Sequence, residues 1–433
     1  MTSLADVHVA FRTWFGPEYD LDAINVVLAT VAAERLGGDP LWLLLVSGPG
    51  NAKTETVQSL SGTGALIIST ITSEGALLSA TPARERAAGA TGGLLQRLGP
   101  TGILVFKDFT SILSMHREGR AQIMAALREM HDGHWVRTVG SDGGQSLEWN
   151  GHIAVIGAVT TAWDMAHGAI AAMGDRFVIF RMDSMKGRQA AARQAMQNIG
   201  TEVEMRAELA LVVEQLLSTI ERGTPSMGLD IEGRDRLMAA ADVVTQGRTS
   251  VEYDGRGYIK EAHAHEMPTR FLKQLGQVVR GAVAIGMDSA HAIELAMRCA
   301  RDSMPPLRLS ILFDVMSHPY THVQDVRKRL DQPRTTISRE LEALHLLRLL
   351  TMEETQLPSG KTQSHYTIAP HINPHVLEPR SCPGSSDLGE QRERGGDTTG
   401  QGMRLFHWLD STDEVPEHAD EMWEEVARTL QYA

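Results

Sequence analysis

Leu41-Trp-Leu-Leu-Leu-Val-Ser-Gly-Pro-Gly-Asn-Ala-Lys-Thr-Glu55 begins with an apolar run of strand length, passes through a Gly/Pro turn and reaches a lysine and a threonine where a helix would begin. A turn of this kind aims backbone N–H groups and a helix N-terminus at phosphate. Lys53 would reach the β- and γ-phosphate oxygens of a nucleotide, and Thr54 would bind Mg²⁺. The residues predicted to hold the nucleotide are Gly48, Pro49, Gly50, Asn51, Ala52, Lys53, Thr54 and Glu55.

The loop departs from the usual pattern G-x-x-x-x-G-K-[ST], which would have glycine at Ser47 and Ala52. Ala52 carries a methyl group where the backbone must approach phosphate. The alternative interpretation is a Gly-Pro-Gly-Asn turn that only joins a strand to a helix. The residues farther along the chain are needed to weigh the two interpretations.

The length and composition limit the classes of protein to which the chain can belong. A chain of 433 residues is long enough for about two to four domains. The formal net charge of -13 argues against a protein that coats nucleic acid non-specifically. With only Cys299 and Cys382, we expect neither a disulfide framework nor a C-x-x-C metal site. No signal pattern and no apolar run of about 18 residues is present, so we expect a soluble cytoplasmic protein with no membrane partner.

Beyond the loop, apolar runs of strand length alternate with helical segments. Such alternation predicts an α/β fold with a doubly wound parallel sheet and the nucleotide at the carboxyl ends of its strands. Asp108 ends one of these runs, where its carboxylate would sit beside Mg²⁺. The runs that follow the loop are residues 64–71, 101–108, 152–159 and 176–181.

Two shorter β-like runs, 134–139 and 145–149, are joined by Gly140-Ser-Asp-Gly-Gly144 and predict a β-hairpin. From about residue 184 to residue 301 the sequence offers no strand, so an all-helical segment is predicted, with breaks at Thr224-Pro225 and Asp254-Gly-Arg-Gly257. His263 and His265 lie two residues apart. They either contribute to a metal site or simply flank a helix.

The pattern after Pro305-Pro306 predicts three helices, at 307–317, 323–330 and 335–347, and two β-like runs, at 350–355 and 362–368. This order is that of a winged helix, whose third helix would enter a major groove of DNA. Residues 321–365 carry seven cations and six anions, so a winged helix that contacts protein is the alternative. The candidate DNA-binding residues are Arg334, Thr335, Thr336, Ser338, Arg339 and Lys361.

The amino-acid composition changes near the end of the chain. Residues 378–402 are rich in Pro, Gly, Ser and mixed charge and predict a flexible linker. Residues 413–430 form an acidic amphipathic helical pattern that would dock on a partner protein or on the body of the chain. The predicted organisation is a helical leader at 1–40, a nucleotide-binding core at 41–183, a helical lid at 184–303, a winged helix at 304–370, a linker at 371–402 and a terminal helix at 403–433.

Residues 41–301 resemble an AAA+ ATPase module of the type that carries a pre-sensor-1 hairpin, and the order of parts carries the resemblance. The loop at 47–54 is similar to the form G-P-P-G-x-G-K-T, and Asp108 falls in the Walker B place. The resemblance implies that ATP and Mg²⁺ are the ligands, with Thr54 and Asp108 at the metal. The winged helix resembles regulators of the ArsR and MarR type, and the fusion is similar to phage and mobile-element ATPases.

Three further catalytic roles are implied by the same resemblance. Thr160 or Thr161, at the end of a strand, falls at sensor 1. Arg176, or less favourably Arg181, resembles an arginine finger that a neighbouring subunit supplies, which implies a ring or filament of identical subunits. Arg270 resembles the sensor 2 arginine that ties the lid to the terminal phosphate.

The sequence lacks the glutamate that usually ends the Walker B strand, since it reads Lys107-Asp108-Phe109. Either Asp108 takes the role of the base and Mg²⁺ is held mainly by Thr54 and water, or another acid such as Glu74 contributes, or hydrolysis is slow. We favour slow hydrolysis.

These observations lead to one main hypothesis and two alternatives. The main hypothesis is an oligomeric ATPase that acts on DNA, with Trp135 and Arg137 of the hairpin touching nucleic acid. The first alternative is a transcriptional regulator that senses nucleotide with little turnover. The second is an assembly or scaffolding ATPase whose protein client docks through the terminal helix.

Overall fold

The computed structural model describes residues 2–79, 92–139, 145–171, 176–183, 185–221, 223, 229–255, 259–356, 358 and 360–380. The described residues up to Arg380 form one compact unit, the first unit of the chain. The terminal helix expected at 403–433, the linker from residue 381 onward, and the breaks expected at 140–144 and 224–225 lie outside the described residues.

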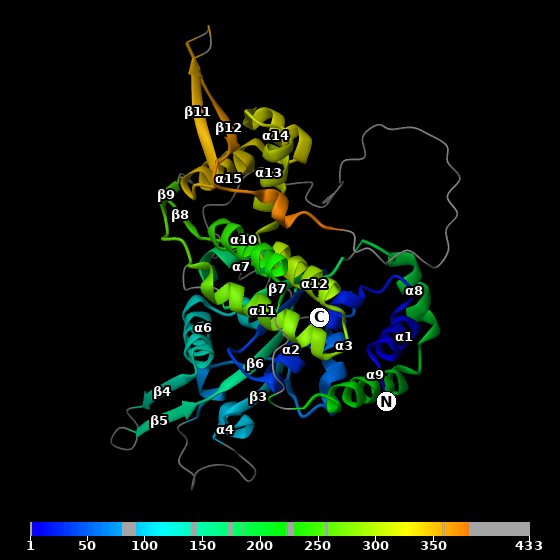
Figure 1. Cartoon of the computed structure of the whole chain (residues 1–433). Helices are drawn as coiled ribbons and strands as arrows, with labels where there is room; N and C mark the ends of the chain where they lie inside the picture. The colour runs from blue at the N-terminus through cyan, green and yellow to red at the C-terminus, as the bar shows by residue number, and fades with distance from the viewer. Residues whose placement is uncertain are drawn as a thin grey trace, which may run out of the picture. The chain divides into compact units, whose positions relative to one another are not determined.

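A five-stranded parallel sheet forms the centre of the first unit (Figure 1). Its strand order is β2-β3-β6-β1-β7, so the first strand lies between the fourth and the last in the chain. All five residues of β1 are buried, as expected for a parallel strand covered on both faces. The α/β class with a parallel sheet is therefore confirmed. The strands are β1 (Trp42–Val46), β2 (Leu66–Ile68), β3 (Thr101–Phe106), β6 (His152–Val159) and β7 (Val178–Arg181).

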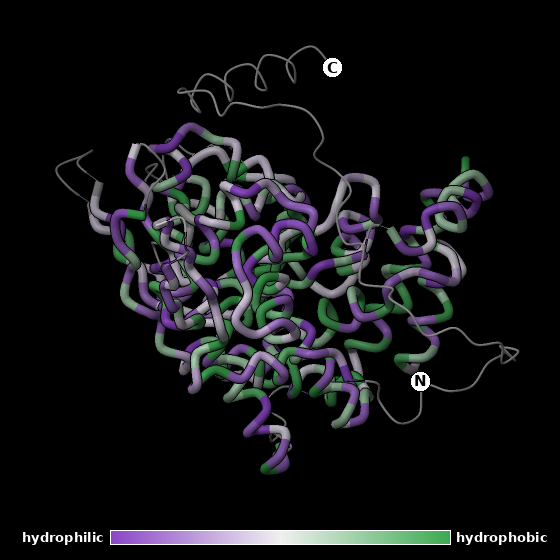
Figure 2. Tube along the Cα trace, turned by 90° about the horizontal axis from the view of Figure 1, so that it is seen from above, coloured by the Kyte–Doolittle hydropathy of each residue, from purple (hydrophilic) through white to green (hydrophobic). Residues whose placement is uncertain are grey.

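Alternate side chains of each strand enter two separate hydrophobic cores, because successive residues of a strand point to opposite faces. Leu43 and Leu45 of β1 lie in the core that also contains helix α2 (Leu21–Leu36). Trp42, Leu44 and Val46 lie in the core that contains helix α6 (Arg117–Asp132). In Figure 2 the apolar segments of the described chain gather in its interior.

Helix α2 is a central element of the structure and not merely a leader to the first strand. Residues Ala23–Ala33 are all buried, because α2 packs on the sheet and also along α11 (Pro268–Ala284). A helix that is apolar all round is expected to be enclosed in this way. The leader helix before it is α1 (Leu4–Phe15).

The other helices of the sheet region are short or follow single strands. They are α3 (Lys53–Gln58), α4 (Leu94–Leu98), α5 (Thr110–Leu113) and α7 (Ala162–Ala171), with the 3-10 turns η1 (Ser59–Gly62) and η2 (Glu74–Ala76). The predicted hairpin is present as β4 (His134–Val139) and β5 (Gln145–Asn150), which pair antiparallel from His134↔Asn150 to Val139↔Gln145.

The segment predicted to be all helical contains a second hairpin, and that prediction was wrong in this respect. Its strands β8 (Val251–Tyr253) and β9 (Ile259–Ala262) pair antiparallel. They are short and largely exposed, so their sequences lack the alternation of apolar and polar residues that predicts a strand. The helices around them are α8 (Arg188–Gln197), α9 (Glu202–Ser218), α10 (Ile231–Gly247) and α12 (Ser289–Asp302).

Residues 306–368 form three helices and a three-stranded antiparallel sheet of order β10-β12-β11. Arg308, at the start of this group, donates from Nη1 to the carbonyl oxygens of Gly247 (2.9 Å) and Thr249 (2.7 Å) at the end of α10. Its Nε donates to Glu340 (2.9 Å). The elements are α13 (Pro306–Ser317), β10 (Thr321–His322), α14 (Val323–Leu330), α15 (Arg334–Leu346), β11 (Leu350–Gln356) and β12 (Thr362–Ile368), followed by the 3-10 turn η5 (Pro374–Leu377).

A search of the described residues finds no helix that is long and apolar enough to cross a membrane.

We predict that Gly281→Ala lowers the free energy of unfolding by about 2–3 kcal/mol, because its new methyl group would overpack a closed helix contact. A Cβ at Gly281 of α11 would lie 1.9 Å from the carbonyl oxygen of Ala29 in α2. Gly276→Ala on the same helix is the matched control, since a Cβ there meets nothing within 4 Å. The control should stabilise by roughly 0.5–1 kcal/mol through helix propensity. Equal denaturation midpoints for the two variants would contradict the tight α2–α11 contact.

Candidate functional site

The loop between β1 and α3 is held in place by its own lysine. Lys53 is 8% exposed. Its Nζ donates to the carbonyl oxygens of Ser47 (3.0 Å) and Gly48 (2.7 Å) and to Ser47 Oγ (3.0 Å). The ammonium group therefore lies inside the curve of the loop, at the N-terminus of α3.

Two residues of the loop have a left-handed backbone conformation, Gly50 with φ +75° and Ala52 with φ 53°. For a residue with a side chain this conformation costs about 1–2 kcal/mol. Ala52 therefore adopts, under strain, a conformation that glycine adopts freely.

Three of the predicted site residues meet at the carboxyl edge of the sheet. The loop follows β1, Asp108 follows β3 and Thr160 follows β6, and β6 lies between the other two strands. Ser47 N donates to Val159 O (3.3 Å), which joins the loop directly to the end of β6. The structure thus brings Lys53, Asp108 and Thr160 to neighbouring positions.

The position of Lys53 inside the loop changes its pKa. Burial lowers the pKa of Lys53 to about 8, and the nearby charge of Asp108 partly opposes that shift. The ammonium form still predominates at neutral pH, because the pKa lies above 7. Thr54, the next residue, is exposed, so its hydroxyl is open to solvent beside the loop.

Asp108 is exposed at the start of α5. Its carboxylate accepts from Ser111 N (3.3 Å) and from Ser111 Oγ. The residue directly after β3 is Lys107, and Asp108 comes one residue later. The carboxylate therefore lies at the rim of the sheet and not at the last position of the strand.

Thr160 is fixed by a neighbouring threonine. Its backbone N–H donates to Thr110 Oγ1 (3.0 Å), and the two hydroxyl oxygens are 3.4 Å apart. Thr160 is half-buried whereas Thr161 is exposed. Of the two sensor 1 candidates, Thr160 is the one whose position the chain holds.

A tyrosine that no motif announces also supports the loop. Tyr19 Oη lies 2.8 Å from Thr56 Oγ1, and Thr56 Oγ1 donates to Ala52 O (2.9 Å). Burial raises the pKa of Tyr19, so its hydroxyl stays protonated. Only the fold could reveal this contact, since 37 residues separate the partners.

Arg176 and Arg270 lie at the other end of the sheet. Arg176 precedes β7, and its Nη2 lies 3.2 Å from Asp132 at the end of α6. Arg270, in the first turn of α11, pairs with Glu266 (2.7 Å). Because β1 is a strand of five residues, the two edges are separated by about 15 Å. The structure therefore does not bring these arginines to Lys53.

The two arginines are instead neighbours of one another. Burial lowers the pKa of Arg176, and the nearby charge of Arg270 lowers it further. Burial lowers the pKa of His131 to about 4, and the charges of both arginines contribute to that shift. His131 is only 9% exposed and lies edge-on to Trp42 at 5.2 Å. The arginine cluster, defined as Arg176 and Arg270, is thus a single cationic feature at the amino edge of the strands.

Four other candidates are engaged within the chain. Arg181 makes two hydrogen bonds to Asp164 (3.0 and 2.6 Å). Glu74 pairs with Arg137 of β4 (2.9 Å). Trp135 is 6% exposed and the Arg137 side chain is 19% exposed, so these two hairpin side chains do not present an open surface to nucleic acid.

The candidate DNA-binding residues line the start of α15 and the β11–β12 hairpin. Arg334, Thr335, Arg339 and Lys361 are exposed, whereas Thr336 and Ser338 are half-buried. No ion pair within the described part of the chain engages any of the three cations, Arg334, Arg339 and Lys361. Their charges therefore remain available to a partner.

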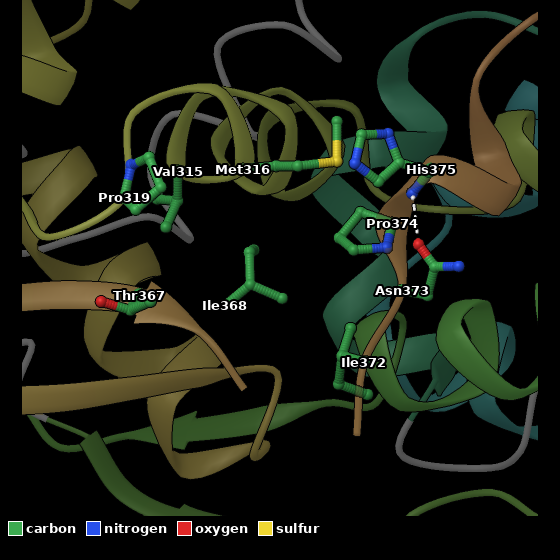
Figure 3. Close-up of a pocket in the computed structure, with 9 residues that line it drawn as sticks. All are labelled: Val315, Met316, Pro319, Thr367, Ile368, Ile372, Asn373, Pro374 and His375. Carbon is green, nitrogen blue, oxygen red and sulfur yellow. Dashed lines mark hydrogen bonds between the residues drawn. The ribbon is translucent and has the colours of Figure 1, made fainter. Parts of the chain in front are cut away.

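Two other features lie apart from the loop. His263 Nε2 lies 3.5 Å from Glu252, and the described residues contain no group of three potential metal ligands. A pocket of about 230 Å³ lies between the ends of α13 and β12 and the turn η5 (Figure 3). Its wall is mostly apolar, and Asn373 Oδ1 accepts from His375 N (3.2 Å) beside it.

Comparison with known proteins gives little. No family model matches the chain, and no curated protein matches it. Among solved structures, the chain is weakly similar to the apo A form of the NrS-1 C-terminal region, with a TM-score of 0.27 and 10% sequence identity. That match covers 84% of this chain and 75% of the other. Likeness at this level supports no conclusion about function.

We predict that nucleotide affinity falls as the pH rises through about 8, by up to roughly tenfold per pH unit above it. The pKa of Lys53 is lowered to about 8, so above that pH the lysine must take up a proton to pair with phosphate. Calorimetry of ATP binding in two buffers of different ionisation enthalpy should detect this proton uptake at pH 8.5 and little at pH 7. Lys53→Arg keeps its charge throughout this range and should bind without proton uptake; uptake that persists in this variant would exclude Lys53 as its source.

Proposed function

We propose that the chain is an ATP-binding protein of the AAA+ type that works as an oligomer and couples nucleotide binding to action on DNA. The observation that carries this proposal is the meeting of Lys53, Asp108 and Thr160 at the carboxyl edge of a parallel sheet of order β2-β3-β6-β1-β7. Ligands of open α/β sheets bind outside the carboxyl ends of the strands.

The residues at this edge have the chemistry that ATP and Mg²⁺ require. Lys53 supplies a positive charge at the N-terminus of α3, where backbone N–H groups also favour phosphate. The exposed Thr54 hydroxyl and Asp108 carboxylate are the oxygen ligands that Mg²⁺ prefers. When bound, Mg²⁺ would neutralise charge on the phosphates. Thr160, held by Thr110, would face the same space.

We further propose that turnover is slow. Glu74, the other candidate base, is occupied by Arg137 at 2.9 Å. That leaves Asp108 as the candidate to orient and deprotonate the attacking water. An aspartate is one methylene shorter than a glutamate, and this one also accepts two hydrogen bonds from Ser111. The shorter side chain reduces its reach toward water, and the bonds from Ser111 engage both of its oxygens.

The position of the arginine cluster favours an oligomer. Arg176 and Arg270 lie at the edge of the sheet opposite the loop, so a cation from this cluster reaches a phosphate only in a neighbouring subunit. Head-to-tail contacts of this kind generate rings or filaments. A positive charge supplied in this way stabilises charge that develops during phosphoryl transfer. We therefore assign Arg270, together with Arg176, to a neighbour's nucleotide.

The group of α13, α14, α15 and the β11–β12 hairpin supports DNA as the second ligand. Three helices followed by a hairpin is the arrangement of a winged helix, whose third helix reads a major groove. α15 presents Arg334, Thr335 and Arg339 to solvent at its N-terminal end. We propose that these residues, with Thr336, Ser338 and Lys361, contact duplex DNA.

A second candidate function is a regulator that binds nucleotide without appreciable turnover. The observation that favours it is the strand end Phe106-Lys107-Asp108, which carries no glutamate. Both functions use the same loop and the same DNA surface, and the rate of ATP hydrolysis distinguishes them.

We predict that hydrolysis, if measured across protein concentrations, rises more steeply than linearly, because each site needs two subunits. Lys53→Ala and Arg176→Ala should each lose activity. An equal mixture of the two should recover about one quarter of the wild-type rate, because one junction in four combines an intact loop with an intact arginine. Lys273→Ala, which removes an exposed pair with Asp39, is the control. A mixture no more active than its components would exclude the shared site.

We predict that the double change Arg334→Ala and Arg339→Ala weakens duplex binding and reduces the slope of log affinity against log salt by about two, since each phosphate contact contributes about 0.9. Fluorescence anisotropy of a labelled duplex at several salt concentrations measures both effects. The control is the double change Arg188→Ala and Arg193→Ala on the exposed helix α8, which should leave the slope unchanged. Equal losses in the two double variants would point to net charge and not to α15.

A further inference from the structure

An ion pair joins the helix after the loop to a helix far along the chain. Glu55 lies in the first turn of α3, directly after Thr54. Its carboxylate accepts two hydrogen bonds from Arg206 on α9, Nη2 to Oε1 (2.7 Å) and Nε to Oε2 (3.0 Å). This geometry is the bidentate form in which both groups are fixed. The hydrogen bonds with Glu55 raise the pKa of Arg206, so the guanidinium remains charged.

Glu55 lies two residues along the chain from Lys53, the residue proposed to pair with phosphate. An unpaired carboxylate at this position would repel a triphosphate bound there. Arg206 opposes this charge, and the pair is only partly shielded from solvent, with exposed fractions of 44% for Arg206 and 22% for Glu55.

We propose that Arg206 is a positioning residue for the nucleotide: by holding the carboxylate of Glu55, it neutralises a negative charge beside the phosphate end of α3 and so raises the affinity for a nucleoside triphosphate. This inference rests on the proposed nucleotide site. Arg206 acts through Glu55, and α9, which carries it, packs against α1 and η1. A second hydrogen bond ties the loop to another part of the chain, since Asn51 Nδ2 donates to Asp183 O (3.3 Å) just after β7.

The test is a double-mutant cycle read by titration with a fluorescent ATP analogue in the presence of Mg²⁺. Arg206→Ala should weaken binding roughly two- to fivefold, the range of a partly exposed charge pair. Glu55→Gln removes the charge and keeps the backbone N–H by which this residue was predicted to contribute to the loop, so it should bind at least as tightly as wild type. The combined variant should return to within about twofold of Glu55→Gln, because no carboxylate remains to be neutralised. The loss in Arg206→Ala should shrink at high salt.

A purely structural role for Arg206 gives a different pattern, in which the combined variant binds as weakly as Arg206→Ala at every salt concentration. That result would overturn the inference. Arg206→Lys keeps the charge without the bidentate geometry and should fall between wild type and Arg206→Ala. Arg236→Ala is the matched control, because it breaks a similar pair with Glu294 between α10 and α12, and its affinity should be unchanged. Melting temperatures of all variants show which are folded.

The outcomes for the inference and for the proposed function are distinct. A wild-type protein that binds no ATP analogue overturns both. Binding that Lys53→Ala abolishes, while Arg206→Ala has no effect on it, overturns only the role of Arg206.

Discussion

The enclosure of α2 is the constraint on which the rest of the structure depends. The helix is buried from Ala23 to Ala33, because it packs against the sheet and against α11. Its contact with α11 is close enough that Gly281 lies against the backbone of Ala29. Burial on this scale is the main favourable term in folding. It also fixes the segment around Tyr19 that supports the loop helix through Thr56.

Electrostatics at the two edges of the sheet differ in kind. At the carboxyl edge one buried ammonium group faces one exposed carboxylate, and the loop's own carbonyl groups satisfy Lys53. At the amino edge, Arg176 and Arg270 lie near a histidine that burial keeps neutral. Each of the two arginines has a carboxylate partner, Asp132 for Arg176 and Glu266 for Arg270, and the Arg270 side chain is also 30% exposed.

The sequence was sufficient for the elements whose signal is local. β1, β3 and β6 were predictable because each is an apolar run of strand length, and parallel strands place their ends at one edge. The same rule predicted that Lys53, Asp108 and Thr160 lie together at that edge. The β4–β5 hairpin was predictable from its Gly-rich turn.

Other features depend on contacts that no local pattern encodes. The β8–β9 hairpin is short and mostly exposed, so burial leaves no alternation in its sequence. The position of Arg270 follows from the packing of α11 along α2, which lies over 200 residues away in the chain. Trp135 was predicted to touch nucleic acid, yet it packs in the core with Trp149. The pairing of Glu55 with Arg206 spans 151 residues.

The three hydrogen bonds of Arg308 have a mechanical consequence. Its guanidinium joins the end of α10 to α13 and, through Glu340, to α15. Pro305 and Pro306 precede it in the chain and would otherwise be a natural place for a joint. These bonds hold α10, α13 and α15 together at the junction, so the exposed Arg334 and Arg339 of α15 keep a fixed position relative to the end of α10.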